Sequence, residues 1–115
     1  MALVIEEHRD RDVVYLTLIG ELDIDTASEL AERCLALRRA GADVRIDLSK
    51  IEFMDGFGVG VLHAAMSHAQ LQHCGFEIEP HVRPRVRAVL HLVGVHVAPP
   101  ESLPADPQCG RGRTR

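Results

Sequence analysis

The hydrophobic pattern of the chain changes its period several times, and these changes restrict the fold more than any other feature. Residues 13–19 are rich in β-branched side chains, and residues 43–48 alternate apolar with polar side chains, so both segments are predicted strands. Between them, the apolar side chains of residues 27–37 recur at the spacing of an amphipathic helix. Strands that alternate with helices predict a mixed sheet with parallel crossovers and helices packed on it.

Extended along the chain, the same criteria predict an α/β fold with its elements in the order ββαβαβα. The predicted strands cover residues 2–6, 13–19, 43–48 and 76–79, and the predicted helices begin near residues 27, 57 and 84. The expected buried stripes are Ala27, Leu30, Ala31, Cys34 and Leu37 in the first helix, and Val86, Val89, Leu90 and Val93 in the third.

Polar residues and glycines predict where these elements begin and end. Thr26 and Glu29 have the spacing of a capping box at the start of the first helix, and Asp55 is expected to cap the second. We expect Gly20 to end the second strand and Gly75 to end the second helix, since glycine often interrupts both kinds of element. Gly41 occupies the position of a C-cap glycine after the first helix.

The chain length and its proline distribution predict the domain organisation. With 115 residues the chain is long enough for one domain and too short for two of ordinary size. Four prolines fall within nine positions near the C-terminus, and the last residues are rich in Gly and Arg. We therefore expect one α/β domain over residues 1–97 and an irregular tail over residues 98–115.

Charge and hydropathy argue against two classes of partner. The formal net charge is −4, and acidic and basic residues are interspersed, so the sequence contains no basic stripe that would bind nucleic acid. No apolar stretch approaches the roughly 20 residues needed to cross a bilayer, and the N-terminus lacks the pattern of a secretory signal. We expect a cytoplasmic protein that binds neither nucleic acid nor a membrane.

Three acidic residues after the second strand, Glu21, Asp23 and Asp25, are the strongest candidates for a metal site. Hard divalent cations bind several carboxylate oxygens, but acidic residues are also common wherever a loop leads into a helix. No calcium-loop motif follows them. No metal is therefore expected at this loop.

Histidines on the second predicted helix are a second candidate for a metal site. His63, His68 and His73 are spaced by five residues, which turns successive rings by about 500° onto different faces of the helix. Such rings cannot share one tetrahedral ion. We expect these histidines to be solvated surface residues.

No pattern in the sequence indicates catalysis or a bound cofactor. No serine or cysteine lies in a nucleophile motif such as GxSxG. The glycines between Asp55 and Gly60 resemble a phosphate loop, but no Walker lysine follows them, and close packing of a helix on a sheet explains them more simply. Phe57 is a large apolar residue at a helix start, which favours a contact with another protein. We expect a binding protein.

The order of elements and two motifs together resemble the STAS domain, a fold shared by bacterial anti-sigma factor antagonists and the cytosolic ends of sulfate transporters. The motifs are Gly20-Glu21-Leu22-Asp23 and the segment of residues 47–62, which reads Asp-Leu-Ser-Lys-Ile-Glu-Phe-Met-Asp-Gly-Phe-Gly-Val-Gly-Val-Leu. The resemblance spans about residues 3–97. It implies that the turn and the start of the second helix bind a GHKL-type, kinase-like anti-sigma factor and so release a sigma factor. The expected partner-binding residues are Asp23, Asp55, Gly56, Phe57, Gly58 and Val59.

The turn differs from the family pattern at the position that matters most for regulation. Many such anti-sigma factors phosphorylate a serine in an Asp-Ser-Ser-Gly turn, whereas this chain reads Asp55-Gly56-Phe57-Gly58 and has no hydroxyl there. The resemblance therefore implies an antagonist without a phosphorylation site in this turn. The alternative is a non-phosphorylatable STAS scaffold subunit of a stress-sensing or lipid-transport complex.

The three cysteines suggest a different form of regulation. Cys34 lies on the buried stripe of the first helix, where a thiol behaves as a small apolar group. Cys74 ends the second helix, and Cys109 lies beside Arg111 and Arg113 in the tail. We predict a reversible Cys74–Cys109 disulfide that fixes the tail to the domain. Two unpaired thiols are the alternative, since disulfides are rare in the cytosol.

Overall fold

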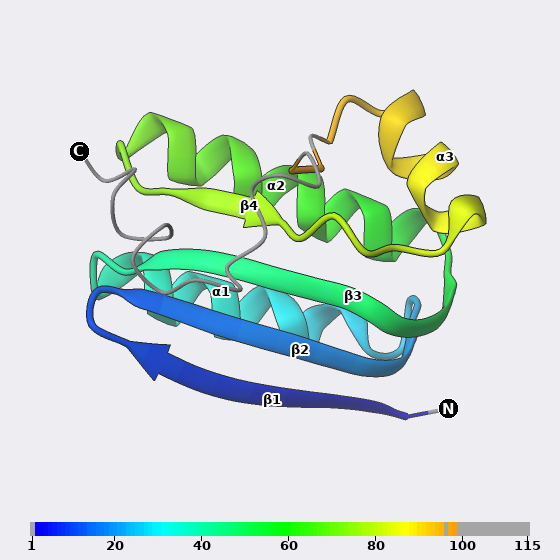
Figure 1. Cartoon of the computed structure of the whole chain (residues 1–115), viewed down its shortest axis with the longest axis horizontal. Coiled ribbons are helices and arrows are strands. Elements are labelled where there is room, and N and C mark those ends of the chain that lie inside the picture. The colour runs from blue at the N-terminus through cyan, green and yellow to red at the C-terminus, as the bar shows by residue number, and fades with distance from the viewer. Residues whose placement is uncertain (1, 96, 99–115) are drawn as a thin grey trace.

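A four-stranded mixed sheet forms the centre of the molecule, and α1 and α2 lie against one of its faces (Figure 1). The computed structural model describes residues 2–95 and 97–98. The strands are β1 (Leu3–Asp10), β2 (Val13–Leu22), β3 (Asp43–Met54) and β4 (Phe76–Ile78), and the helices are α1 (Ala27–Arg39), α2 (Gly56–Leu71) and α3 (Pro84–Leu92). The expected α/β fold and the ββαβαβα order are confirmed.

The strands lie in sequence order across the sheet. β1 pairs with β2 antiparallel, whereas β2, β3 and β4 are parallel and are joined by α1 and α2. Alternate side chains of β2 and β3 point toward these helices and form an aliphatic core with α1 and α2. The fully buried members of this core include Val14, Leu16, Leu18, Leu30, Ile46, Leu48 and Leu62.

Arg45 lies on β3 among the residues that alternate with the core positions, and it is only 2% exposed. Its guanidinium group forms ion pairs with two acidic residues of the β4 region, at 2.8 Å to Glu77 and 2.9 Å to Glu79. Removing one partner of a buried ion pair leaves a charge without compensation, which is costly. These ion pairs therefore help to fix β4, a strand of only three residues, against β3.

The second strand does not end at Gly20, as expected from the sequence. β2 continues to Leu22, and Gly20 lies at an irregularity of the β2–β3 register with a φ of +115°. A Cβ atom at this position would lie 2.3 Å from the carbonyl oxygen of Ala2. The glycine is needed because the backbone of Ala2, just before β1, approaches it closely, and β2 continues through the register irregularity.

Two other expectations about helix boundaries and faces need correction. α2 ends at Leu71, and His73 rather than Gly75 takes the left-handed conformation, with a φ of +59°. The Gly75 amide instead donates to Asp43 Oδ1 at 2.7 Å. Ala31 and Val93, expected in the buried stripes, are both exposed. Gly41, in contrast, has the expected positive φ of +76° after α1.

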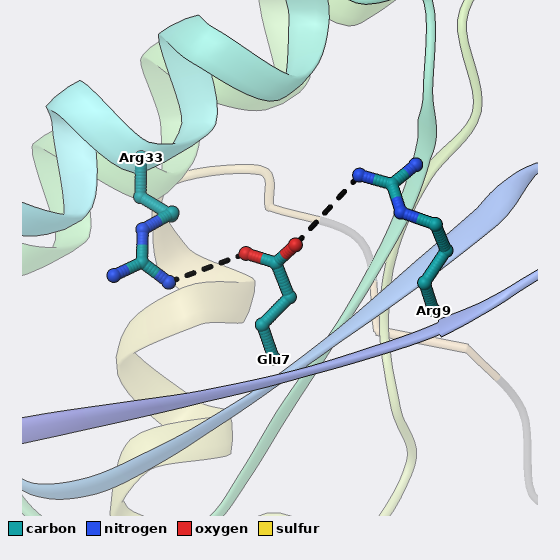
Figure 2. A network of polar contacts seen from close by, with 3 residues as sticks. All are labelled: Glu7, Arg9 and Arg33. Atoms are coloured by element: carbon teal, nitrogen blue, oxygen red, sulfur yellow. Dashed lines mark hydrogen bonds and ion pairs between the residues drawn. The ribbon is translucent and has the colours of Figure 1, made fainter.

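The edge strand β1 contacts α1 through charged side chains (Figure 2). Arg33 of α1 pairs with Glu7 of β1 at 3.3 Å, and Arg9 approaches the other oxygen of the same carboxylate at 3.7 Å. Exposed ion pairs contribute only about 0–1 kcal/mol each, so the backbone pairing with β2 and the burial of Leu3, rather than this network, hold β1 in place. Within the described residues, no helix is long and apolar enough to cross a membrane.

The glycines of α2 differ in their surroundings, which predicts opposite effects of the same substitution. A Cβ atom at Gly58 would lie 2.6 Å from the Leu22 carbonyl oxygen, whereas a Cβ atom at Gly60 meets nothing within 4 Å. We expect Gly58→Ala to lower the free energy of unfolding by about 1–3 kcal/mol through overpacking. Gly60→Ala should raise it by up to about 1 kcal/mol. Urea unfolding of both variants tests this, and equal effects would contradict the close packing at Gly58.

Candidate functional site

Two segments that follow neighbouring parallel strands meet at one end of the sheet. Leu22, the last residue of β2, pairs with Met54, the last residue of β3. The β2–α1 loop, residues 23–26, follows β2. Asp55 follows β3 and is the N-cap of α2. The Asp55 amide donates to the Leu22 carbonyl oxygen at 3.2 Å, so the two segments are in direct contact.

The Asp55 carboxylate joins these two segments. Its Oδ1 accepts hydrogen bonds from the amides of Phe57 at 2.9 Å and Gly58 at 3.1 Å, which are free donors at the start of α2. Its Oδ2 accepts a hydrogen bond from the Ile24 amide in the β2–α1 loop at 3.2 Å. The expected cap is confirmed, and the same side chain also holds the neighbouring loop.

Asp23 shapes the β2–α1 loop from within. The residue is only 8% exposed, and its Oδ1 accepts hydrogen bonds from the amides of Asp25 at 3.0 Å and Thr26 at 3.2 Å. This is the turn that an aspartate makes when it binds backbone groups two and three residues ahead. The expected contact of Asp23 with the partner stays a prediction, and its hydrogen bonds position the exposed part of the loop.

Thr26 precedes α1 as expected, but it does not form a capping box with Glu29. Its Oγ1 accepts a hydrogen bond from the Asp23 amide at 3.0 Å and donates one to the Glu21 carbonyl oxygen at 2.9 Å. The Glu29 amide bonds to the Thr26 carbonyl oxygen instead. The hydroxyl is used to close the loop, and it is therefore not available as a helix cap.

Large apolar side chains are exposed on both sides of the Asp55 carboxylate. Phe57 is 59% exposed and Ile24 is 58% exposed. Together with Asp55 and the exposed Gly56 they form what we call the contact surface. Sequence reasoning did not select Ile24, although an isolated apolar residue between two acids, Asp23 and Asp25, is a usable signal.

Gly58 and Val59 were expected to bind the partner, but both are buried. Gly58 packs against Leu22 and Met54, and Val59 is only 5% exposed. Both lie one helical turn before Leu62, on the buried face of α2, which explains their burial. Their burial places them outside the exposed contact surface, and their expected role in partner binding stays a prediction.

A cleft of about 630 Å³ adjoins the contact surface on the side of α3. Phe53, which is half exposed and precedes Asp55 by two residues, lines it together with Arg83 and Arg85 at the start of α3. Sequence reasoning did not select these residues either, because nothing in the local pattern places α3 beside the end of β3. The cleft thus places another half-exposed aromatic side chain near Asp55, and Glu52 lines it together with the two arginines.

The described residues provide little for other chemistry. His63, His68 and His73 are exposed, and no group of three or more His, Cys, Asp or Glu side chains in the described part of the chain is arranged to hold a metal ion. Burial raises the pKa of the Cys34 thiol to about 11, although Arg38 and Arg33 act in the opposite direction. This thiol therefore stays protonated at neutral pH, and protonated thiols are weak nucleophiles.

Comparison with known proteins gives a consistent result. The family model described as "Mlab, STAS domain" matches residues 5–103. The anti-sigma-B factor antagonist of Bacillus subtilis (strain 168) is 27% identical over 79 residues, which cover 69% of this chain and 72% of that protein.

Solved structures with the same fold include two anti-sigma factor antagonists. SpoIIAA in its unphosphorylated form superposes with a TM-score of 0.72 and 22% identity, over 99% of this chain and 98% of the other. An antagonist from Mycobacterium paratuberculosis gives a TM-score of 0.67 and 25% identity, over 81% of this chain and 79% of the other.

The Asp55 hydrogen bonds predict a measurable loss of stability when the carboxylate is removed. We expect Asp55→Ala to lower the free energy of unfolding by about 1–2 kcal/mol, the usual effect of losing an N-cap. Asp25→Ala is the matched control, because Asp25 is exposed and lies in the joined loop; it should change stability by less than about 0.5 kcal/mol. Chemical denaturation compares the two, and similar losses would mean that Asp55 does not hold the site together.

Proposed function

The chain belongs to the STAS domain family, and from this premise we propose that it is an anti-sigma factor antagonist, which binds an anti-sigma factor and thereby releases a sigma factor. The curated relative and the mycobacterial protein, at 27% and 25% identity, both carry the name of antagonist. The proposed partner is a GHKL-type, kinase-like anti-sigma factor. The proposed action is binding, without a chemical step on the partner.

The observation that carries this proposal is the contact surface itself. Two large apolar side chains, Ile24 and Phe57, are more than half exposed at positions that a single carboxylate holds. Protein interfaces are enriched in aromatic residues at their centres, and a preorganised surface loses less conformational entropy on binding. An exposed apolar pair fixed at the end of β2 and β3 is what a protein partner would bury.

The contact surface also bears on how the complex is regulated. Residues 55–60 contain no hydroxyl group, whereas SpoIIAA was solved in both an unphosphorylated and a phosphorylated form. A phosphate adds about −1.5 to −2 charges, which is enough to disrupt an apolar interface. We propose that this chain lacks such a switch in its turn and keeps its partner bound in the presence of ATP.

A scaffold subunit of a stress-sensing or lipid-transport complex is the second candidate. The absence of a hydroxyl at Gly56 and Phe57 also favours this candidate, because a scaffold needs no phosphorylation site in the turn. The two candidates differ in their assembly. A large and stable homo-oligomer in light-scattering measurements would favour the scaffold, and a small species that binds an anti-sigma factor would favour the antagonist.

The proposed function is tested by isolating the partner and adding ATP. We expect affinity purification from the native cytosol, followed by mass spectrometry, to recover an anti-sigma factor. The purified complex should persist with ATP and magnesium, and residues 55–60 should remain unmodified. Phe57→Ser is the matched variant, because it returns a hydroxyl to the turn and makes phosphorylation possible. Dissociation of the wild-type complex by ATP would contradict the proposal.

The same binding assay tests the position of the contact surface. Phe57→Ala should weaken binding about tenfold or more, since aromatic anchors at the centre of an interface commonly contribute above 1 kcal/mol. Leu71→Ala is the control, because Leu71 is 77% exposed and lies at the opposite end of α2. If the two substitutions change the affinity equally, the partner binds elsewhere.

Redox control remains a further proposal for the same protein. Cys74 is a half-buried free thiol after the end of α2, and Cys109 lies outside the described residues. We expect mild oxidation to form a Cys74–Cys109 disulfide that peptide mapping without reductant detects. Cys34→Ser should leave this product unchanged, because Cys34 is not part of the pair. Recovery of both thiols free would contradict it.

A further inference from the structure

A separate apolar groove of about 480 Å³ runs between α1 and α2. Ala31 and Leu35 of α1 and Val61 and Ala64 of α2 line it, and Phe57 lies at one end. The groove stays open because its α2 side carries small residues: a Cβ atom at Gly60 would meet nothing within 4 Å. The molecule therefore has an apolar site of the size usual for small ligands, 300–1,000 Å³.

The other end of the groove is cationic. Arg38 of α1 and His68 of α2 both line it, and Arg38 Nη1 donates a hydrogen bond to His68 Nδ1 at 3.2 Å. Among the described residues, no carboxylate forms an ion pair with Arg38. A guanidinium group binds carboxylates in a bidentate manner and here has donors to spare, so this end favours an anion.

We propose that this groove binds a free fatty acid, with its carboxylate at Arg38 and His68 and its hydrocarbon chain directed toward Phe57. The two ends, at Phe57 and His68, are 11 residues apart on α2. At a rise of 1.5 Å per residue they are about 16 Å apart. An extended chain of about 12 carbons covers this length at roughly 1.3 Å per carbon, the projection of a tetrahedral carbon–carbon bond.

The dimensions favour a hydrocarbon chain over a helix from another protein. A helix with its side chains is about 10–12 Å across, so a 16 Å length of it occupies on the order of 1,300 Å³, nearly three times the groove volume of about 480 Å³, and only one of its faces would lie in the groove. An amphiphile with one anionic end also matches the distribution of the lining, which is apolar along the groove and charged only at Arg38, with the polar ring of His68 beside it.

Calorimetric titration of the purified chain with sodium laurate tests the site without any protein partner, so its result does not depend on the proposed function. Arg38→Glu should weaken laurate binding about tenfold or more. Arg39→Glu is the matched control, because Arg39 is exposed on the same helical turn and does not line the groove, and it should change the affinity less than twofold. Equal effects of the two reversals, or no laurate binding by the wild type, would overturn the proposal.

A second pair of variants tests the groove itself. Gly60→Leu places a side chain in the open space and should abolish laurate binding, whereas His63→Leu adds similar apolar area on an exposed position outside the groove and should not. Circular dichroism and thermal unfolding serve as the control that both variants are folded. Dodecanol, which has the chain without the carboxylate, should bind the wild type at least about tenfold more weakly. Tight binding by Gly60→Leu would assign the laurate to another apolar surface.

Discussion

The Asp55 carboxylate is the interaction on which the geometry of the functional end depends. The start of a helix leaves backbone donors without intrahelical partners, and a capping side chain that accepts from them contributes roughly 0.5–2 kcal/mol. Asp55 accepts two of these amides with one oxygen and uses the other for the Ile24 amide. The positions of Ile24 and Phe57 are therefore not independent. A group that is needed for folding also sets the spacing of the apolar pair that we assign to partner binding.

Two alternating glycines of α2, Gly58 and Gly60, lie on opposite sides of the helix, one facing the sheet and the other facing the groove. Gly58 is required on the buried side, because its Cβ atom would collide with Leu22 where the helix crosses the end of β2. Gly60 faces the opposite way and is in no contact that excludes a larger residue. Its presence costs helix stability of up to about 1 kcal/mol relative to alanine. The missing side chain affects the structure only on the side of α1, where it keeps the groove open.

Hydrophobic periodicity was sufficient to predict the order of the elements, because strand and helix periods differ and each element buries one face. It was not sufficient where a side chain has several possible partners. Thr26 fits a capping box by its spacing, but the hydroxyl is taken by the Asp23 amide and the Glu21 carbonyl. Gly20 was expected to end the strand, but the glycine is instead required inside β2 by the close approach of the Ala2 backbone. Asp55 was found because its cap is local, whereas its bond to Ile24 spans 31 residues.

Phe57 belongs to both surfaces, and this shared residue implies a coupling between them. The side chain is part of the contact surface and also lines the groove between α1 and α2. A protein partner that buries Phe57 and a fatty acid that packs against it would use the same exposed atoms. Linkage requires that each ligand then weakens the other by the same factor. A chain without a hydroxyl in its turn would in this way still respond to a small molecule, through competition for one aromatic ring.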